Sequence, residues 1–393
     1  MRLVAFILLA SGLASTTQGY DVVVEAGPYA RRNVVVSFDL PVSPGTSWRL
    51  LEGTAGVPLQ VMGARASFVV SSLAANTSKV YTLAAGAGPS GVLVNAVREG
   101  DYVHFSRETR LITRYIGGRG PLPSGVSESY RRAGYVHPVY TPRGRTVTED
   151  MPSDHRHHHG VWLAWTKATI DGHAVDFWNM GQNKGGVQFE ALDEVWSGPA
   201  YAGLRARHRY IDKVPNPDQI ALWEHYALQV YPGGGSGTGT YSLFDIDVTH
   251  DRVGTTPMFL PTYHYGGVGY RAASEWNSNP SRMSVLTSEG KTRSNGDGTR
   301  ARWIRISGTL GGQPAAIVIY GHPANFRAPQ SLRVNPTDPF FCYAPSKLGN
   351  WQINPDQPYR MRYRFAVYDE APSVAEMERL WNDYAQPPAV TVR

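Results

Sequence analysis

The chain has 393 residues, enough for one large domain or two of medium size, and its single cysteine excludes an internal disulfide bond. Its formal charge is +6, but the 38 lysines and arginines are scattered and form no basic run. Because nucleic-acid binding requires a concentrated basic patch, we expect no nucleic acid as a partner. Most of the basic residues are arginines, whose flat guanidinium suits carboxylates and phosphates, so an anionic sugar is one candidate substrate.

Residues 1–19 have the layout of a signal peptide. Arg2 is followed by an apolar run from Leu3 to Ala10 and then by small and polar residues up to Gly19. The apolar run is too short to span a bilayer. We therefore expect cleavage near Gly19 and export of the mature protein to the periplasm or beyond. Because no later segment is apolar for long enough, we expect no membrane span.

The remaining chain has the texture of an all-β protein, with 41 glycines, 28 prolines and 11% aromatic residues. Turn signals separate short strand-like runs, as is typical of an antiparallel sandwich or barrel. Strands are predicted at 22–25, 34–38, 48–51 and 79–83, and a joint rich in glycine and proline follows at 86–91. We therefore predict a small N-terminal β domain over 20–90 and a large β-sandwich body over 91–393.

Within the body, residues 241–250 and 360–367 alternate between apolar and polar side chains. This alternation predicts antiparallel strands with one face in solvent. The glycine-rich segment 232–237 reads as a hairpin connection between two strands. A single convincing helix is predicted over 373–385, where apolar residues from Val374 to Tyr384 fall on one stripe and close the body.

Four of the twelve histidines fall within five positions, at His155, His157, His158 and His159, directly after Asp154. An apolar, strand-like run follows them. If the cluster itself were a strand, His155, His157 and His159 would share one face, with neighbours about 6.6 Å apart along it. The pattern therefore predicts His155 and His157 as a convergent pair.

Three chemical uses of this cluster remain open. His155 and His157 could hold a divalent metal, although a metal site needs a further ligand from elsewhere. The candidates for that ligand are Asp154, Glu190, His264 and Glu275. Alternatively, the Asp154–His155 pair could give or take a proton near neutral pH, or the histidines could simply hydrogen-bond a polar ligand. The structural alternative is that they satisfy buried backbone groups.

Three other segments are candidate binding elements. His264 and Tyr265 lie in an aromatic stretch before a glycine turn, which suits stacking on a sugar. Asn325 and Arg327 follow the apolar run 315–320, and Arg327 could hold a carboxylate with two parallel hydrogen bonds. Asp176 offers a carboxylate two residues before a tryptophan. A hairpin corner, a capped turn and core packing are the respective structural alternatives.

Several separated segments resemble, in order, a bacterial family that carries the label methane oxygenase PmoA. They are residues 135–144, 154–160, 264–267, 322–327, 340–345 and 359–367, and the resemblance runs from about residue 100 to 370. The family motif reads Asp-His-Pro-His-His-Arg-Gly. Five positions match it, whereas Arg156 stands in place of the proline and His159 in place of the arginine. The matching residues are Asp154, His155, His157, His158 and Gly160.

Members of this family resemble exported proteins of polysaccharide-degrading bacteria, and the body resembles the galactose-mutarotase-like double β-sandwich of carbohydrate-active proteins. The resemblance implies an exported enzyme of lyase, hydrolase or epimerase type that acts on a sugar or modified glycoside. A non-catalytic glycan-binding protein is the first alternative, and a metal-dependent oxygenase is the second. The candidate catalytic residues are His155, His157, His158 and His264, and the candidate substrate-binding residues are Asp154, Asp176, Tyr265, Asn325 and Arg327.

Overall fold

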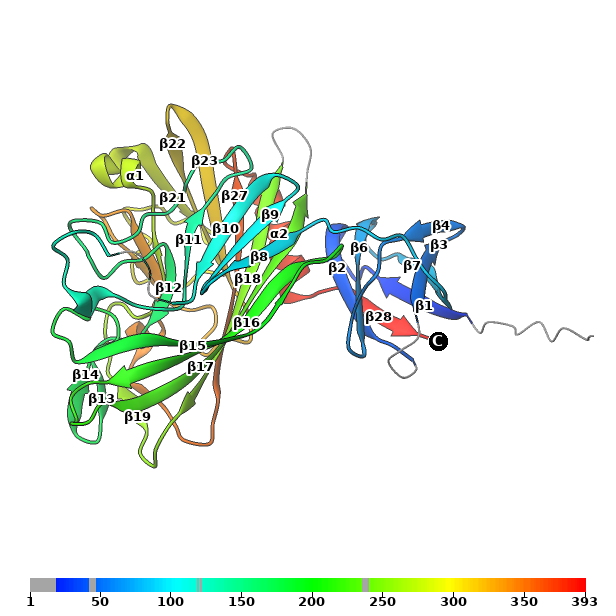
Figure 1. The fold of residues 1–393 in the computed structure, drawn as a ribbon. Helices are drawn as coiled ribbons and strands as arrows, with labels where there is room; N and C mark the ends of the chain where they lie inside the picture. Colours follow the sequence, from blue (N-terminus) through cyan, green and yellow to red (C-terminus); the bar gives the residue numbers. More distant parts are fainter. Residues whose placement is uncertain (1–18, 42–46, 119, 121, 235–239) are drawn as a thin grey trace, which may run out of the picture.

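The computed structural model describes residues 19–41, 47–118, 120, 122–234 and 240–393. These residues form antiparallel β-sheets together with a few short helices (Figure 1), which confirms the predicted all-β class. The predicted signal peptide, apart from Gly19, lies outside the described residues, as do residues 235–237 of the glycine-rich connection at 232–237. Export therefore stays a prediction.

The first seven strands and the last one form a small unit. One sheet has the order β28-β1-β7-β3-β4 and the other β2-β6-β5, and buried residues such as Val22, Phe38 and Phe68 fill the space between them. The strands are β1 (Tyr20–Glu25), β2 (Arg31–Asp39), β3 (Trp48–Glu52), β4 (Ala55–Val57), β5 (Gln60–Met62), β6 (Arg65–Leu73), β7 (Ser78–Ala85) and β28 (Ala389–Val392).

The end of the chain returns to this unit. β28 pairs with β1, with Val22 opposite Val392, and Figure 1 shows the red strand beside the blue one. The body was predicted to extend to residue 393, because the sequence of a four-residue strand does not show which strand it pairs with. A domain boundary near residue 90 stays a prediction.

The body contains two eight-stranded antiparallel sheets. The first has the order β24-β25-β20-β12-β11-β10-β9-β8 and the second β15-β16-β17-β18-β27-β23-β22-β21. The first comprises β8 (Asn95–Glu99), β9 (Tyr102–Arg107), β10 (Arg110–Ile116), β11 (Tyr135–Val139), β12 (Val161–Ala164), β20 (Gly267–Arg271), β24 (Leu332–Val334) and β25 (Phe340–Tyr343). The second comprises β15 (Gly185–Trp196), β16 (Ala202–Asp212), β17 (Gln219–Gly234), β18 (Tyr241–Arg252), β21 (Met283–Thr287), β22 (Trp303–Leu310), β23 (Gln313–Gly321) and β27 (Tyr359–Tyr368).

A smaller sheet and short helical segments complete the body. The sheet has the order β14-β13-β19-β26, from β13 (Ala168–Ile170), β14 (His173–Val175), β19 (Met258–Leu260) and β26 (Trp351–Ile353). The short helix α1 (Ser274–Ser278) follows β20, and 3₁₀ segments occur at Glu128–Tyr130, Pro280–Arg282 and Pro345–Leu348.

The alternating strands pack as predicted. Phe244 of β18 lies opposite Phe365 of β27, and their rings stack with centroids 4.7 Å apart in the buried core. On the other face of the same pair, Arg364 donates to Asp245 at 2.7 and 2.9 Å. This alternation explains why one face of the second sheet belongs to the core that it shares with the first sheet.

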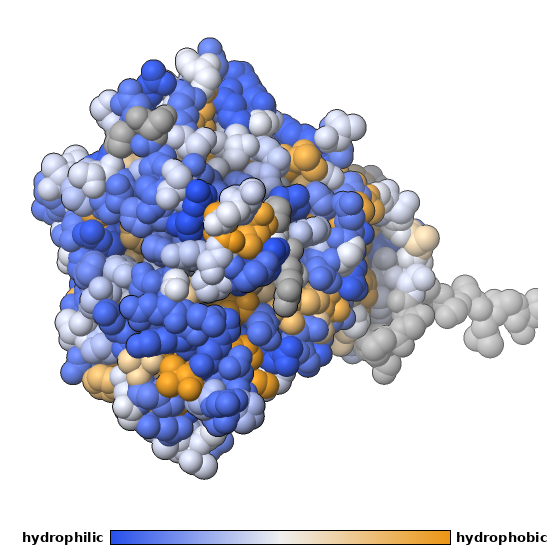
Figure 2. Space-filling view, turned by 60° about the vertical axis from the view of Figure 1, so that its left-hand side comes forward, coloured by the Kyte–Doolittle hydropathy of each residue, from blue (hydrophilic) through white to orange (hydrophobic). Residues whose placement is uncertain are grey.

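The predicted C-terminal helix is present as α2 (Val374–Ala385). Ser373 caps it by accepting a hydrogen bond from the Glu376 backbone, and Met377 and Leu380 are buried against the second sheet. Within the described ranges, no helix is long and apolar enough to cross a lipid bilayer. The face of the molecule in Figure 2 is mostly hydrophilic, with small and separate apolar patches.

A buried ion pair joins the small unit to α2, and it supplies a test of the fold. Arg31 of β2 donates to Asp383 at 3.1 Å, and both side chains are at most 3% exposed. Asp383→Ala leaves a buried guanidinium without its main charge partner, so we expect the free energy of unfolding to fall by about 3–5 kcal/mol. Asp39→Ala breaks the exposed pair with Arg65 and should cost less than about 1 kcal/mol. Equal losses in denaturant unfolding would contradict the buried pair.

Candidate functional site

The histidine cluster lies in a loop before β12 and forms no strand, so the strand geometry considered for 155–159 does not apply. The loop turns back on itself, because the Met151 amide donates to the His158 carbonyl at 2.8 Å and the His158 amide to the His155 carbonyl at 2.9 Å. Side chains of such a turn do not alternate between two faces. Gly160 is required at its end, since a Cβ atom there would clash with the carbonyl oxygen of Val136.

The turn changes which histidines face each other. The rings of His155, His157 and His158 gather, with centroids 4.6–5.6 Å apart. His159 points to the other side, where its Nδ1 lies 2.7 Å from Asp150 and its ring packs against Tyr135. The histidines that gather are thus His155, His157 and His158, which were named as candidate catalytic residues, and the strand face shared with His159 is not formed.

These three histidines line a pocket of about 330 Å³, which we call the histidine pocket. His264 and Tyr265, about a hundred residues further along the chain, line the same pocket. Its ten lining residues are His155, His157, His158, Trp178, Asn179, His264, Tyr265, Arg333, Asn335 and Phe340. The fold thus brings together all four histidines that the sequence analysis named as candidate catalytic residues.

The aromatic side chains form much of the pocket wall. His158 stacks on Phe340 with ring centroids 4.7 Å apart, and it also stacks on His155 at the same spacing. Trp178 and Tyr265 lie 5.4 Å apart by ring centroids. The pocket therefore combines flat apolar faces with imidazole nitrogens.

Asp154 orients His155. Its carboxylate receives the His155 Nδ1–H at 3.0 Å and two hydrogen bonds from Arg271 Nη2, at 2.8 and 3.0 Å. Burial acts to raise the pKa of Asp154, but the hydrogen bonds from Arg271 and His155 outweigh it and lower that pKa to about 2. Because the charged carboxylate can only accept, Nδ1 carries the proton and Nε2 of His155 is left with a lone pair.

Arg271 imposes the opposite tautomer on His158. Its Nη1 lies 3.4 Å from His158 Nδ1, and a guanidinium can only donate, so Nδ1 is the acceptor and Nε2 carries the proton. Burial, followed by the neighbouring imidazoles, lowers the pKa of His158 well below its ordinary value and that of His157 to about 3. In the stacked pair, Nε2 of His158 is therefore a hydrogen-bond donor and Nε2 of His155 is an acceptor.

Asp176 supports the pocket from behind. Its carboxylate accepts from the backbone amides of Trp178 and Asn179 at 2.9 Å, and from the Asn179 side chain at 2.6 Å. Asn179 in turn accepts a hydrogen bond from the Tyr265 hydroxyl at 3.0 Å. Asp176 therefore positions two lining residues and does not itself line the pocket.

Asn325 and Arg327 are not brought to the histidine pocket. Asn325 exchanges two hydrogen bonds of 2.8 Å with the backbone of Arg362. Arg327 donates to the carbonyls of Pro345, Gly349 and Asn350 at 2.7–3.0 Å. Both side chains are occupied with backbone groups, which explains why polar residues at a strand end need not meet a ligand.

Arg333, Asn179 and Asn335 line the pocket although the sequence analysis did not single them out. Arg333 lies on the edge strand β24, which reaches the site only through the pairing of β24 with β25 and of β25 with β20. No local motif surrounds Arg333 or Asn335. Asn179 could have been predicted, because it directly follows the candidate segment Asp176–Trp178.

The donor set does not fit a metal centre. Across the described parts of the chain, no group of three or more His, Cys, Asp or Glu side chains is placed to hold a metal ion. Asp154, the carboxylate beside His155, is already held by Arg271. Neither Glu190 nor Glu275, the other carboxylates considered as ligands, lines the histidine pocket.

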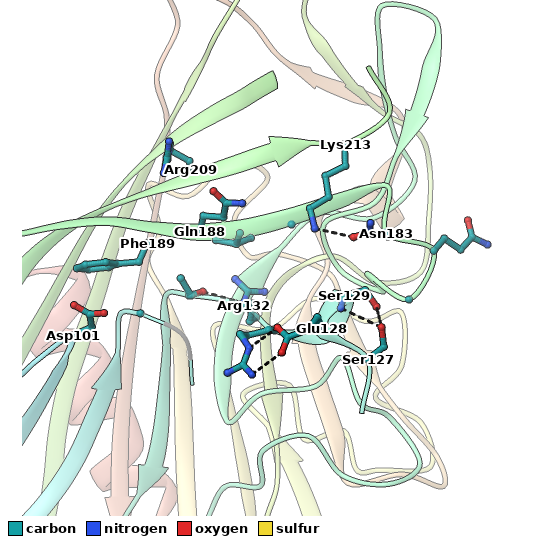
Figure 3. Close-up of a pocket in the computed structure, with 17 residues that line it drawn as sticks. Asp101, Ser127, Glu128, Ser129, Arg132, Asn183, Gln188, Phe189, Arg209 and Lys213 are labelled. Carbon is teal, nitrogen blue, oxygen red and sulfur yellow. Dashed lines mark hydrogen bonds and ion pairs between the residues drawn. The ribbon is translucent and has the colours of Figure 1, made fainter. Parts of the chain in front are cut away.

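A second pocket, of about 810 Å³, is larger but chemically less distinctive (Figure 3). Its walls come from residues 127–133, the start of β15 and the end of β16. Arg131 donates to Glu128 at 2.8 and 3.0 Å and Lys213 to the neutral amide of Asn183 at 2.8 Å, and the lining contains no histidine. We favour the smaller pocket because its imidazole nitrogens are available for chemistry.

The family model described as a family of unknown function (DUF6807) matches residues 102–382, which is more than half of the chain. The protein belongs to the DUF6807 family. No curated protein matches its sequence. The label methane oxygenase PmoA, which the sequence resemblance carried, receives no support from these comparisons.

Among solved structures, the DUF6807 protein is similar to one from Salmonella typhimurium described as a "putative mutarotase (YeaD)". The sequence identity is 10% and the TM-score is 0.32, with 70% of this chain and 90% of that chain covered. A likeness at this level carries no conclusion about activity.

The depressed histidine pKa values predict acid sensitivity. His157, with a pKa of about 3, and His137, with a pKa of about 4, titrate near 6.5 once unfolded. Between these values the unfolded chain binds more protons, so stability should fall as the pH drops below about 6.5. His157→Gln should flatten the dependence of Tm on pH between 6.5 and 4. The exposed His225 provides the control His225→Gln, and an unchanged slope in His157→Gln would refute the assignment.

Proposed function

We propose that the histidine pocket binds a sugar or modified glycoside and catalyses proton transfer on it. The observation that carries the proposal is the convergence of four histidines on a single pocket with aromatic walls. One of them, His155, is paired with a carboxylate that Arg271 also holds. His155 acts as the general base, and His158 acts as the hydrogen-bond donor to a substrate oxygen. Lyase, epimerase and hydrolase chemistry each require such a pair.

The shape and lining of the pocket support a sugar. Its volume of about 330 Å³ falls at the lower end of the range for small-molecule sites, which suits one sugar ring. The ring of Tyr265, which is partly exposed, can pack against the C–H face of a pyranose, whereas Trp178 and Phe340 are buried in the wall. The imidazole nitrogens of His157 and His264, for which no hydrogen bond to another described residue is found, can bind hydroxyl groups.

The chemistry follows from the fixed tautomers. Asp154 holds the His155 ring in place and stabilises the imidazolium that forms when Nε2 accepts a proton. The Nε2–H of His158 can donate to a developing negative charge on a substrate oxygen. Since burial keeps His157 and His158 neutral at pH 7, neither repels a proton arriving at His155.

A non-catalytic glycan-binding protein is the second candidate. The aromatic walls are consistent with this candidate, because they would bind a glycan whether or not the protein is an enzyme. A binding site alone does not require a carboxylate that fixes the tautomer of a single imidazole, and the Asp154–His155 pair is therefore the feature that separates the two candidates.

The decisive test is the substitution His155→Ala. Purified protein would be assayed with neutral and acidic sugars and their glycosides, with readouts for new double bonds, new reducing ends and inverted stereocentres. We expect turnover to fall by about 100- to 10,000-fold while binding persists. His225→Gln, on the outer face of the second sheet, should retain full activity. Binding without any turnover in the wild type would favour the glycan-binding candidate, and no effect of His155→Ala would exclude the proposed role.

We also propose that the protein acts after export. The support is the composition of residues 1–19, with a basic start, a short apolar run and small residues at the expected cleavage position. Sequencing the N-terminus of the protein recovered from a bacterial host should find a start near Tyr20 in the periplasmic or secreted fraction. A cytoplasmic protein that retains Met1 would contradict this.

A further inference from the structure

Most polar side chains of the histidine pocket, apart from the histidines, are occupied with holding its walls. Asn179 donates to Thr166 and Asp176 and accepts from Tyr265. Asn335 donates to Asp338 at 2.9 Å, and its Oδ1 accepts from the backbone amides of Thr337 and Asp338. These amides and the tyrosine hydroxyl have few hydrogen bonds left to offer a ligand.

Arg333 is different. Its side chain is 22% exposed, and the only ion pair found for it among the described residues is with Asp297, at 3.4 Å. Asp297 is held more closely by Lys347, whose Nζ lies 2.9 Å from the other carboxylate oxygen. No hydrogen bond from the Arg333 guanidinium to another described residue is found. Its donors are therefore available to a ligand.

The charge around Arg333 is not balanced within the pocket. None of the ten lining residues is an aspartate or a glutamate. Arg333 and Lys347 both pair with Asp297, so two positive charges share one negative charge beside the pocket. Burial and then the charge of Arg333 lower the pKa of His264, so the Arg333 charge acts on a second residue that lines the pocket.

We infer that the substrate is a sugar acid whose carboxylate is held by Arg333, in the same pocket as His155. A guanidinium offers two parallel donors to the two oxygens of a carboxylate, and its single charge matches that of one carboxylate. A phosphate ester, which approaches two negative charges at neutral pH, would leave part of its charge uncompensated here. This inference rests on the proposed function, and within it Arg333 determines specificity and takes no part in proton transfer.

The test is calorimetric titration of the full-length protein with D-glucuronate and D-galacturonate, and with D-glucose and D-galactose, as free sugars and methyl glycosides. We expect the uronates to bind about tenfold or more tightly than the neutral sugars, because a charged hydrogen-bond pair is lost in the neutral ones. Arg333→Gln should reduce this preference to about twofold. Arg333→Lys should retain part of it, since it keeps the charge but not the fork.

Arg360→Gln is the matched control, because Arg360 pairs with Asp247 on the exposed face of the second sheet, away from the pocket. An unchanged Tm would show that Arg333→Gln folds. The inference is overturned if Arg333→Gln keeps the preference for uronates, or if the wild type binds neutral sugars equally well. Tighter, Arg333-dependent binding of glucose 6-phosphate would overturn it in favour of a phosphate ester.

Failure of the inference and failure of the proposed function give different results. If neutral sugars are turned over in a His155-dependent way without any preference for acids, only the role of Arg333 falls. If no sugar of either kind is bound, or if turnover does not depend on His155, the proposed function falls and the inference falls with it.

Discussion

The geometry of the histidine pocket depends on one buried guanidinium. The Arg271 side chain is fully buried in β20, and it is shared between Asp154, Glu149 and His158. Its backbone amide also donates to the Gly160 carbonyl, at the end of the histidine loop. A buried charge is tolerated only when it is paired, so the loop that supplies Asp154 has to close over β20. Arg271 thereby fixes the histidine loop to β20 of the first sheet.

A second buried polar network supports the sandwich beneath. Glu224 of β17 accepts from His208 and His250, each at 2.7 Å, and from the Tyr210 hydroxyl at 3.0 Å. Burial acts to raise the pKa of Glu224, but the hydrogen bonds from the two histidines outweigh it and lower that pKa. His250 also accepts from the Trp165 indole, one residue before the Thr166 that binds Asn179. The core and the pocket wall are thus connected through hydrogen bonds, which restrict how far the wall can shift.

Local sequence patterns predicted more of the fold than of the site. Alternation in β18 and β27 and the Ser373 cap of α2 depend on neighbours in sequence, so they were predictable. The density of histidines also located the pocket. The grouping of His155 with both His157 and His158 depends on a turn whose hydrogen bonds run between backbone groups, which side-chain patterns do not encode. Arg333 reaches the pocket through strand pairing across the first sheet, and such long-range register cannot be read from a single sequence.

The pairing of β28 with β1 has a consequence for the order in which the protein can be assembled. During synthesis β1 leaves the ribosome before the body, whereas its partner β28 leaves after it. β1 can pair with β7 early, but its other edge stays open until the whole body has been made. An open edge is a template for pairing with other chains. The small unit is thus completed only after the body has been made, and removal of β28 would leave one edge of β1 unpaired.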